Sequence, residues 1–362
     1  MTMEKKPLVL IMKNPGTTCN IGCVYCAEER KKYISVDTKI EYELVDKIAN
    51  LTDQYSLNVL FHGGEPTILP VDYYKNIIEV FTKSNPDVYF GLQTNGTLIN
   101  DEWIQFLKDY KDKVGVSVSL DGTKEINRFR LTKDKKETFD TVKNAINQLA
   151  DNGLKTGMIC TIVSSSLGRE RELIEMLMDF NNLLFVKLNP CFDLNHDGTI
   201  PYWGITPDQY VQFVINFFTI MFERGIWNQF FVEPIISAFK NLQNVRSSFC
   251  NFNLDKCSQF ISLYPDGTIT SCDNYTLKQG KLGDLNTTDD LGDVLTMKDN
   301  PQLLNDYHKL MNQCETCEYE ELCKGGCIAV RMRYNDTNEY CVAMKKMFNH
   351  FRKVYEEAYA NS

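Results

Sequence analysis

Three cysteines near the start of the chain have a spacing that suits a metal centre. Cys19, Cys23 and Cys26 follow one another as C-x3-C-x2-C in the loop after the first apolar run. A [4Fe-4S] cluster is normally held by four thiolates, so three would leave one iron open, as three-ligand zinc sites leave one position open. The structural alternatives are an incomplete zinc knuckle or three unrelated thiols, because short motifs carry false positives.

A second group of cysteines lies in the C-terminal third of the chain. It contains Cys250, Cys257, Cys272, Cys314, Cys317, Cys323, Cys327 and Cys341. Eight thiolates are enough for two closed sites of four ligands each, and a pair of structural zincs is the serious alternative to two iron-sulfur clusters. For the remaining two cysteines, Cys160 and Cys191, we expect the role of small buried hydrophobic side chains.

The elements that must position these groups alternate along the first half of the chain. Near-continuous apolar runs predict strands at Pro7–Asn14, Asn58–Gly64, Val88–Gly96, Val114–Gly122, Leu154–Val163 and Phe185–Pro190. Amphipathic patterns predict helices at Ile40–Leu51, Val71–Lys83, Asp101–Tyr110, Glu137–Asn152 and Glu170–Phe180. This alternation predicts an α/β fold with a parallel sheet and right-handed crossovers. Six strands are too few for a closed eight-stranded barrel, so we expect an open, partial barrel.

Polar or glycine-rich motifs end three of the predicted strands. They are HGGEP at 62–66, QTNG at 93–96 and SLDG at 119–122. Active sites in this architecture gather at the C-terminal ends of the strands. Gly63 and Gly64 would let the backbone approach a ligand closely, so we expect a ligand there.

The pattern changes after residue 190. Thr206 to Gln209 predicts a capping box at the start of a helix that runs through Phe222. Residues 265–267, Pro-Asp-Gly, predict a hairpin in the cysteine-rich segment, and Ala343–Tyr359 predicts a C-terminal helix. We therefore expect a barrel domain with its following helix at residues 1–230 and a small cysteine-rich domain at residues 231–362.

Composition limits the class of protein. The 362 residues carry a net charge of −9, which argues against nucleic acid or an anionic membrane as a partner. No apolar stretch reaches the ~18 residues of a membrane span, and the N-terminus does not have the pattern of a signal peptide. Thirteen cysteines, an odd count, fit metal ligands in a reducing compartment better than disulfides. We expect a cytoplasmic protein.

The cysteine triplet resembles the radical S-adenosylmethionine (SAM) superfamily, since CNIGCVYC includes the aromatic Tyr25 before the third cysteine. The resemblance implies a partial (β/α)6 barrel and a [4Fe-4S] cluster on Cys19, Cys23 and Cys26 that binds SAM. Reductive cleavage of SAM then gives a 5′-deoxyadenosyl radical that abstracts a hydrogen atom. The motif at Gly63, Gly64 and Glu65 resembles the family's GGE motif, which contacts the methionine amino group. By the same resemblance, Asn95, Ser119 and Arg130 are candidates for ribose and carboxylate contacts.

The later cysteines resemble the SPASM domain, with Cys250 as an extra ligand. The family's connectivity implies one auxiliary [4Fe-4S] cluster on Cys250, Cys257, Cys272 and Cys327. A second would lie on Cys314, Cys317, Cys323 and Cys341. Further motifs, LQTNGTLI, SLDGTKEI, CDNY, KLGDL and LCKGGC, are similar to those of anaerobic sulfatase-maturating enzymes and of SPASM enzymes that modify ribosomal peptides.

The resemblance implies an enzyme that oxidises or cross-links a side chain in a peptide or protein substrate. An electron donor such as flavodoxin or ferredoxin would serve it. Asp273 matches the general base of the sulfatase-maturating group, and a solvated turn aspartate is the alternative. A ribosomal peptide is the preferred substrate, because Ala27 and the Cys250-x6-Cys257 spacing depart from the sulfatase-maturating pattern. The alternatives are an anaerobic sulfatase-maturating enzyme that oxidises Cys or Ser to formylglycine, and a non-catalytic zinc-stabilised scaffold.

Overall fold

The computed structural model describes residues 5–30, 39–247, 249–253, 257, 259–298, 300–334 and 338–360. Packing divides the chain into two compact units. The first unit comprises Met1–Ser119, Leu131–Thr156 and Cys257–Leu304, and the second comprises Leu120–Arg130, Gly157–Lys256 and Asn305–Ser362. Residues Cys257–Leu304 of the cysteine-rich segment therefore pack in the same unit as the first strands of the chain. The domain boundary after residue 230 stays a prediction.

The first unit is built on a sheet whose strands lie in the order β10-β9-β8-β1-β2-β3-β4. Their bounds are β1 Pro7–Lys13, β2 Ser56–His62, β3 Tyr89–Thr94, β4 Val114–Ser119, β8 Phe260–Leu263, β9 Thr268–Thr270 and β10 Lys281–Asp284. Strands β1 to β4 are parallel, and Lys13 pairs with His62 at the C-terminal edge. β8 joins the other side of β1, also in parallel, and forms the predicted antiparallel hairpin with β9. The hairpin of the cysteine-rich segment thus extends the parallel sheet.

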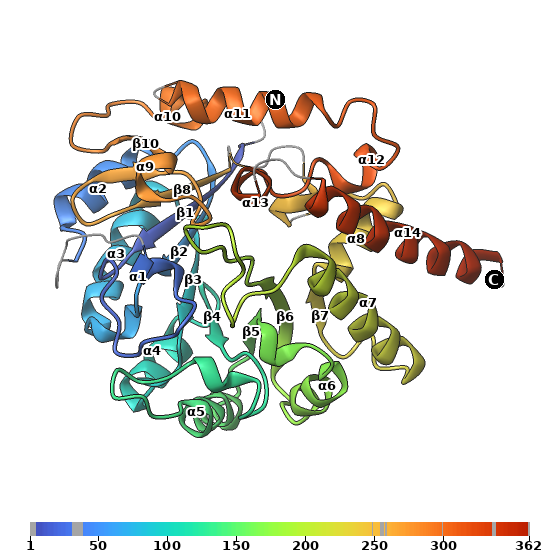
Figure 1. Cartoon of the computed structure of the whole chain (residues 1–362). Helices are drawn as coiled ribbons and strands as arrows, with labels where there is room; N and C mark the ends of the chain where they lie inside the picture. Colours follow the sequence, from blue (N-terminus) through green and yellow to red (C-terminus); the bar gives the residue numbers. More distant parts are fainter. Residues whose placement is uncertain are drawn as a thin grey trace. The chain divides into compact units, whose positions relative to one another are not determined.

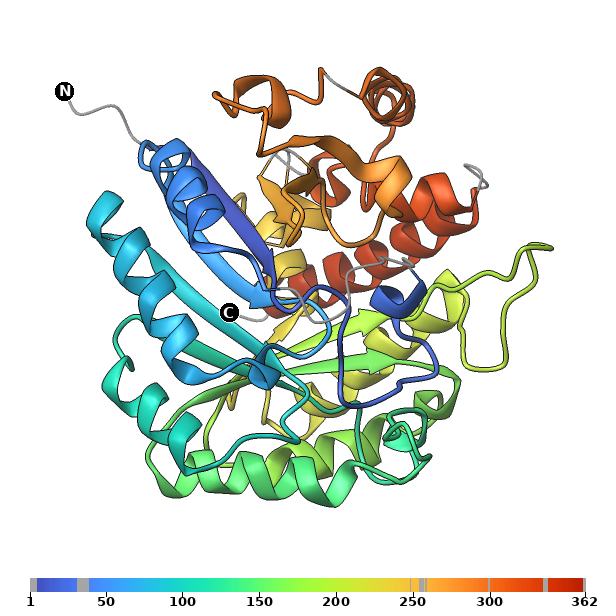
Figure 2. The ribbon, with the colours of Figure 1, turned by 90° about the vertical axis from the view of Figure 1, so that its left-hand side faces the viewer.

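Helices of the first unit follow the strands along the chain. They are α1 Ala27–Arg30, α2 Tyr42–Leu51, α3 Val71–Ser84, α4 Asp101–Asp109, α5 Phe139–Asp151, α9 Leu277–Gly280 and α10 Gly292–Leu295. Helices α2, α3 and α4 lie on one face of strands β1 to β3 (Figures 1 and 2). α3 buries Tyr74 against Phe61 of β2, with ring centroids 4.8 Å apart, and Phe61 stacks on Phe90 of β3. These three rings are fully buried and join the helix layer to the sheet.

The second unit has strands in the order β5-β6-β7. Their bounds are β5 Thr156–Ile162, β6 Leu183–Pro190 and β7 Phe231–Glu233. Its helices include α6 Glu170–Met178, α7 Pro207–Glu223, α8 Ile235–Leu242, α12 Glu320–Cys323, α13 Ile328–Arg333 and α14 Glu339–Ala360, and α11 Pro301–Asn312 leads into it from the first unit. The predicted capping box is confirmed at α7, where the Gln209 N–H donates to Thr206 Oγ1 at 3.1 Å.

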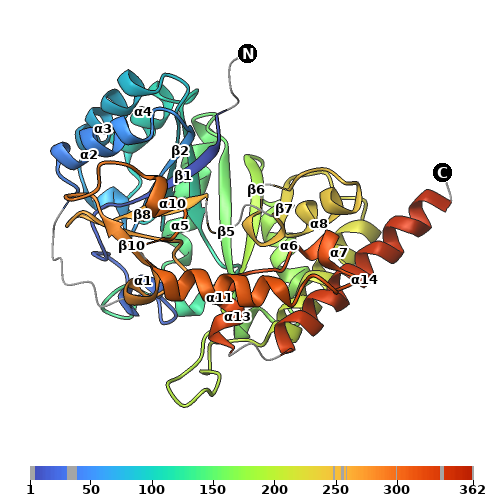
Figure 3. The same cartoon turned by 90° about the horizontal axis from the view of Figure 1, so that it is seen from above.

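The C-terminal helix completes the core of the second unit. α14 lies beside α7 (Figure 3). Phe351 of α14 is fully buried between Phe218 of α7 and Phe239 of α8, with ring centroids 5.2 and 5.3 Å away. The predicted C-terminal helix is thus confirmed.

The six predicted strands and the five predicted helices between them are confirmed, with ends that differ by a few residues. The α/β class and its parallel core are therefore as expected. Two short strands, β7 and β10, were not predicted, because segments this short carry no clear alternation. No helix in the described part of the chain has the length and apolar character to cross a membrane.

We expect the aromatic contact of α14 to stabilise the protein. Phe351→Ala should lower the free energy of unfolding by about 3–5 kcal/mol, because it removes a fully buried ring and leaves a cavity. The matched control is Val342→Ala on the same helix, where the side chain is 61% exposed. Thermal or urea unfolding of the two variants checks this, and equal midpoints would contradict it.

Candidate functional site

The loop of the first three cysteines begins at the C-terminal end of β1. The Gly16 N–H donates to the Lys13 carbonyl at 2.7 Å, and the Gly22 N–H donates to the Leu131 carbonyl at 2.7 Å. These bonds fix the loop within the first unit on both sides of Cys19. Cys19, Cys23 and Cys26 are all partly exposed residues.

The two glycines after β2 pack against this loop. The Gly64 N–H donates to the Gly16 carbonyl at 2.9 Å, and the Glu65 N–H donates to the Thr18 carbonyl at 2.9 Å. A Cβ on Gly64 would lie 1.9 Å from the Thr18 carbonyl oxygen, and Gly63 has a φ of +128°. The close approach that these glycines permit is therefore to the chain's own cysteine loop.

Glu65 joins the ends of β2 and β3. Its carboxylate is fully buried and accepts hydrogen bonds from four donors: the Thr67 N–H and hydroxyl, the Thr94 hydroxyl and the Asn95 N–H, at 2.6 to 3.0 Å. Burial raises the pKa of Glu65. Three of these donors bond to Oε1 and one bonds to Oε2, so most of the acceptor capacity of the carboxylate is used within the protein. Its geometry is that of a brace between strand ends.

Asn95 connects the end of β3 to the cysteine loop. Its Nδ2 lies 3.7 Å from Cys19 Sγ and 2.9 Å from Asn20 Oδ1. The Asn20 amide in turn donates to the Thr97 hydroxyl at 2.8 Å. Burial raises the pKa of the Cys19 thiol, and the amide of Asn95 opposes that shift. Among the predicted residues, the structure thus brings Asn95, Gly63, Gly64 and Glu65 together with the triplet.

The other two predicted cofactor contacts lie in different units. Ser119 is the last residue of β4 and is half-buried. Arg130 belongs to the second unit, where the residue is 7% exposed and its Nη1 lies 3.9 Å from Asp121 Oδ1. Asp121 also accepts the Thr161 N–H at 3.0 Å. Arg130 is thus held at the start of the second unit by a buried carboxylate.

Asp273 lies beside a buried lysine. Lys13, the last residue of β1, is completely buried, and its Nζ lies 2.6 Å from Asp273 Oδ1, 2.8 Å from Glu28 Oε1 and 2.9 Å from His62 Nδ1. An ammonium has no acceptor, so it donates to all three groups, and His62 Nδ1 acts as an acceptor. Glu28 comes from α1 and His62 ends β2. We call these four residues the Lys13 cluster.

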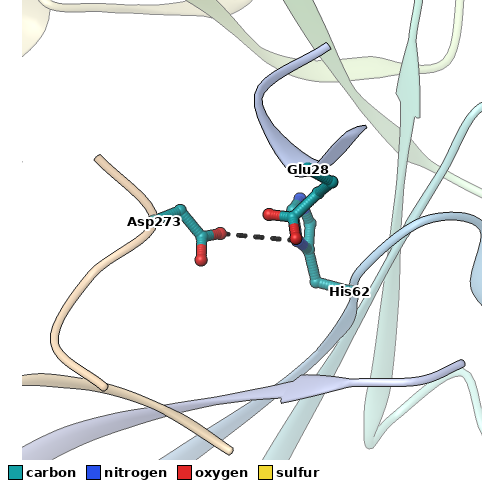
Figure 4. Close-up of side chains that lie close together, drawn as sticks. All are labelled: Glu28, His62 and Asp273. Atoms are coloured by element: carbon teal, nitrogen blue, oxygen red, sulfur yellow. Dashed lines mark ion pairs between the residues drawn. The ribbon is translucent and has the colours of Figure 1, made fainter. Parts of the chain in front are cut away.

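Three members of the Lys13 cluster have the composition of a metal site. Glu28, His62 and Asp273 point toward one another, and their ligand atoms all lie within 4.8 Å (Figure 4). Among the described residues, no other group of three or more His, Cys, Asp or Glu side chains is gathered this closely. The Lys13 ammonium bonds to all three, so it stands where a metal ion would bind.

The later cysteines are distributed over both units. Cys257 and Cys272 belong to the first unit, with Cys272 next to Asp273. Cys250, Cys314, Cys317, Cys323, Cys327 and Cys341 belong to the second unit. There, the Cys327 N–H donates to the Tyr340 hydroxyl at 3.0 Å, and Arg331 Nη1 lies 3.3 Å from Cys314 Sγ. Cys160 and Cys191 are buried, as predicted.

Sequence reasoning missed three members of the Lys13 cluster. Lys13 carried a signal, because a lysine at the end of an apolar strand is unusual. His62 directly precedes the two glycines and was part of a motif that ends a strand. Glu28 had no signal, since it is one acidic residue in a run of charged ones.

Comparison with known proteins supports the resemblance found in the sequence. Residues 13–180 match the model of the radical SAM superfamily. The chain is 27% identical to a cysteine-type anaerobic sulfatase-maturating enzyme of Clostridium perfringens, over 95% of this chain and 96% of the relative. It is 23% identical to a serine-type enzyme of Bacteroides thetaiotaomicron, over 89% of this chain and 83% of the relative.

Solved structures give the same result. The native anaerobic sulfatase-maturating enzyme anSMEcpe with bound AdoMet superposes with a TM-score of 0.83 at 25% identity, over 98% of this chain and all of that one. Streptococcus suis SuiB shares the fold at 16% identity, with a TM-score of 0.63 over 91% of this chain and 75% of that one. The cofactors are accordingly SAM and [4Fe-4S] clusters. Residues 13–180 form a radical SAM domain, and the homologous enzymes indicate that this chain is a radical SAM enzyme.

Proposed function

We propose that this enzyme oxidises or cross-links a side chain in a peptide substrate, beginning with abstraction of a hydrogen atom. One observation carries the proposal. Asp273, from the cysteine-rich segment, lies at the C-terminal ends of β1 and β2, the same edge of the sheet from which the cysteine loop begins. The cysteine loop would supply the radical that takes the hydrogen atom, and the Asp273 carboxylate at the same edge would take the proton. Both lie within the first unit.

The residues of the cysteine loop fit the cofactors. Cys19, Cys23 and Cys26 offer three partly exposed thiols, and we propose that they hold the [4Fe-4S] cluster that binds SAM. When bound, this pair supplies the 5′-deoxyadenosyl radical by reductive cleavage. Asn95, Ser119 and Arg130 remain our candidates for contacts with SAM, together with the backbone at Gly63 and Gly64. For Glu65 we propose an indirect role, because its carboxylate is occupied by protein donors.

For the later cysteines we propose two auxiliary clusters. Cys250, Cys257, Cys272 and Cys327 would hold one, and Cys314, Cys317, Cys323 and Cys341 the other. The donor set supports this, because eight thiols from one segment match two sets of four. We also propose an electron donor such as flavodoxin or ferredoxin, and a cytoplasmic location, since reduced cysteines persist there.

Lys13 determines how Asp273 can act. Its ammonium, completely buried, donates to Asp273 Oδ1 at 2.6 Å and so fixes the carboxylate at the edge of the sheet. Asp273 itself is 29% exposed, which leaves it accessible to a substrate. We propose that it accepts the proton that the substrate radical loses after hydrogen abstraction, while an auxiliary cluster accepts the accompanying electron. Lys13 is then a positioning residue for Asp273.

We consider two classes of peptide as the substrate. A ribosomal peptide comes first, because Ala27 and the Cys250-x6-Cys257 spacing depart from the sulfatase-maturating pattern. Oxidation of Cys or Ser to formylglycine in a sulfatase is the second candidate. It is favoured by the Clostridium perfringens relative, which matches this chain over 95% of its length. One anSMEcpe structure holds the Cp18Cys peptide, which provides a probe for the second class.

The reconstituted enzyme should form 5′-deoxyadenosine from SAM and dithionite without oxygen. Changing Cys19, Cys23 and Cys26 together to alanine should abolish this product and leave iron on the eight later cysteines. Chromatography and iron assays measure both. Mass spectrometry then compares the Cp18Cys peptide with short peptides encoded beside the gene. Continued formation of 5′-deoxyadenosine by the triple variant would contradict the assignment of the first cluster.

We expect Gly64→Ala to lose the iron of the first cluster. The new Cβ would overlap the Thr18 carbonyl, so the cysteine loop must move and its bonds to residues 64 and 65 must break. The matched control is Gly22→Ala in the same loop, where a Cβ meets no atom within 4 Å. Iron and sulfide assays check this. Equal iron in the two variants would show that the close contact does not shape the site.

Asp273→Asn should separate the two halves of the reaction. The amide keeps the size of the carboxylate but cannot take a proton, so modified peptide should fall by about 10²–10⁴-fold while 5′-deoxyadenosine still forms. Asp289→Asn, with a side chain that is 94% exposed, is the control in the same unit. An unchanged yield of modified peptide would make Asp273 an ordinary turn residue. Loss of cluster iron would make it structural.

A further inference from the structure

A buried arginine in the second unit points at one of the later cysteines. Arg331 lies in α13 and is only 3% exposed. Its Nη1 lies 3.3 Å from Cys314 Sγ and 3.3 Å from the Gly325 carbonyl, and its Nη2 donates to Gln313 Oε1 at 2.6 Å. A guanidinium has donors only and keeps its charge at every physiological pH. A full positive charge is therefore held in hydrogen-bonding contact with this sulfur.

The surrounding backbone holds the guanidinium in place. Cys314 itself is buried, and its Sγ also lies 3.6 Å from the Leu310 carbonyl. A Cβ on Gly325 would lie 2.8 Å from Met311 Sδ and 3.5 Å from Cys314 Sγ, so the chain passes close to the thiol here. The Gly325 carbonyl on this segment accepts from the same Nη1 that faces the sulfur. Neighbouring groups thus hold both Arg331 and Cys314 in the positions that make this contact.

We propose that Arg331 raises the reduction potential of the auxiliary cluster that Cys314 holds. The inference rests on the proposed assignment of Cys314 as a cluster ligand. Reduction adds one negative charge to a cluster, and hydrogen bonds to its sulfurs are one of the factors that set the potential. A guanidinium at a buried sulfur stabilises the reduced form more than the oxidised one, because the attraction is weakly screened there. Arg331 would therefore make this cluster easier to reduce.

A second arginine on the same helix provides a matched control. Arg333 lies two residues later in α13, and its Nη1 donates to the Phe192 carbonyl at 2.8 Å. It has the same charge and the same side-chain length, and this donor group faces a carbonyl rather than a sulfur. Replacing either arginine by glutamine changes the net charge equally. A difference in midpoint potential between the two variants therefore reports the contact with Cys314.

The experiment uses the full chain with Cys19, Cys23 and Cys26 changed to alanine, reconstituted with iron and sulfide without oxygen. This background leaves only the auxiliary clusters to be observed. Cys314→Ser first identifies the cluster that Cys314 holds, as the electron paramagnetic resonance signal that it alters. Redox titration of that signal then compares Arg331→Gln, Arg331→Lys and Arg333→Gln with the background protein.

We expect Arg331→Gln to lower the midpoint potential of the identified cluster. At the midpoint of the background protein, the ratio of reduced to oxidised cluster should fall about tenfold, which is 59 mV for a one-electron couple. Arg331→Lys, which retains the charge, should recover part of the shift. Arg333→Gln should leave the midpoint unchanged. An unchanged midpoint in Arg331→Gln at full iron content, or equal shifts at both arginines, would overturn the proposal.

A measurement on protein with Arg331 in place covers the case in which Arg331→Gln loses its cluster. With arginine labelled by a nitrogen isotope, pulsed resonance spectra of the reduced background protein should show a nitrogen coupled to the cluster. The coupling should vanish in Arg331→Lys and persist in Arg333→Gln. Its absence in the background protein would overturn the proposal. If Cys314→Ser altered no signal, the assignment of this ligand would fall with it, whereas cleavage of SAM at the first cluster would be untouched.

Discussion

One buried ammonium group connects the elements on which the site of the first unit depends. Lys13 ends β1 with no exposed surface and bonds to residues of α1, of β2 and of the turn after β9. A lysine charge in such a place is costly unless it is paired, and here two carboxylates and an imidazole satisfy it. The pairing works only if the hairpin of β8 and β9 lies beside β1, which brings Asp273 to the edge. The lysine therefore links the cysteine-rich segment to the strands of the radical SAM domain.

The buried carboxylate of Glu65 likewise connects neighbouring elements, here the end of β2 and the end of β3. Glu65 receives four protein donors that follow β2 and end β3, three of them at Oε1 and the Asn95 N–H at Oε2. The GGE and QTNG motifs are thus one structural unit rather than two independent ligand contacts. Asn95 extends that unit to Cys19 through its side chain. Rigid strands in this way position a loop that must keep three thiols open.

Much of this arrangement could be predicted from the sequence. Apolar runs and helical periodicity located the strands and helices, and the spacing of the cysteines indicated the cofactors. The capping box at Thr206 and the hairpin at residues 265–267 had local signals and are confirmed. The pairing of β8 with β1 could not be predicted, because it depends on contacts between residues about 250 positions apart. The approach of Asp273 to Lys13 depends on that pairing. The contacts of Lys13 with Glu28 and His62 depend instead on the path of the loop after β1 and on the register of β1 with β2, so these three residues were not recognised as a cluster. The close fit of Gly64 against Thr18 was likewise visible only in three dimensions.

Lys13 and Arg331 are both buried cations in a chain with a net charge of −9, and each lies in contact with one group of a proposed functional site. Thiolate-bound clusters carry negative charge, and they add it to a protein that already has an excess of carboxylates. Surface lysines are screened by water and salt, whereas a cation inside the fold is screened less and acts more strongly on its neighbour. Lys13 acts on a carboxylate at the strand ends, and Arg331 acts on a sulfur of the second unit. Lys13 is held by two carboxylates and an imidazole, and Arg331 by a carbonyl and an amide oxygen. Each of them therefore fixes the geometry of the group it faces as well as acting on it through its charge.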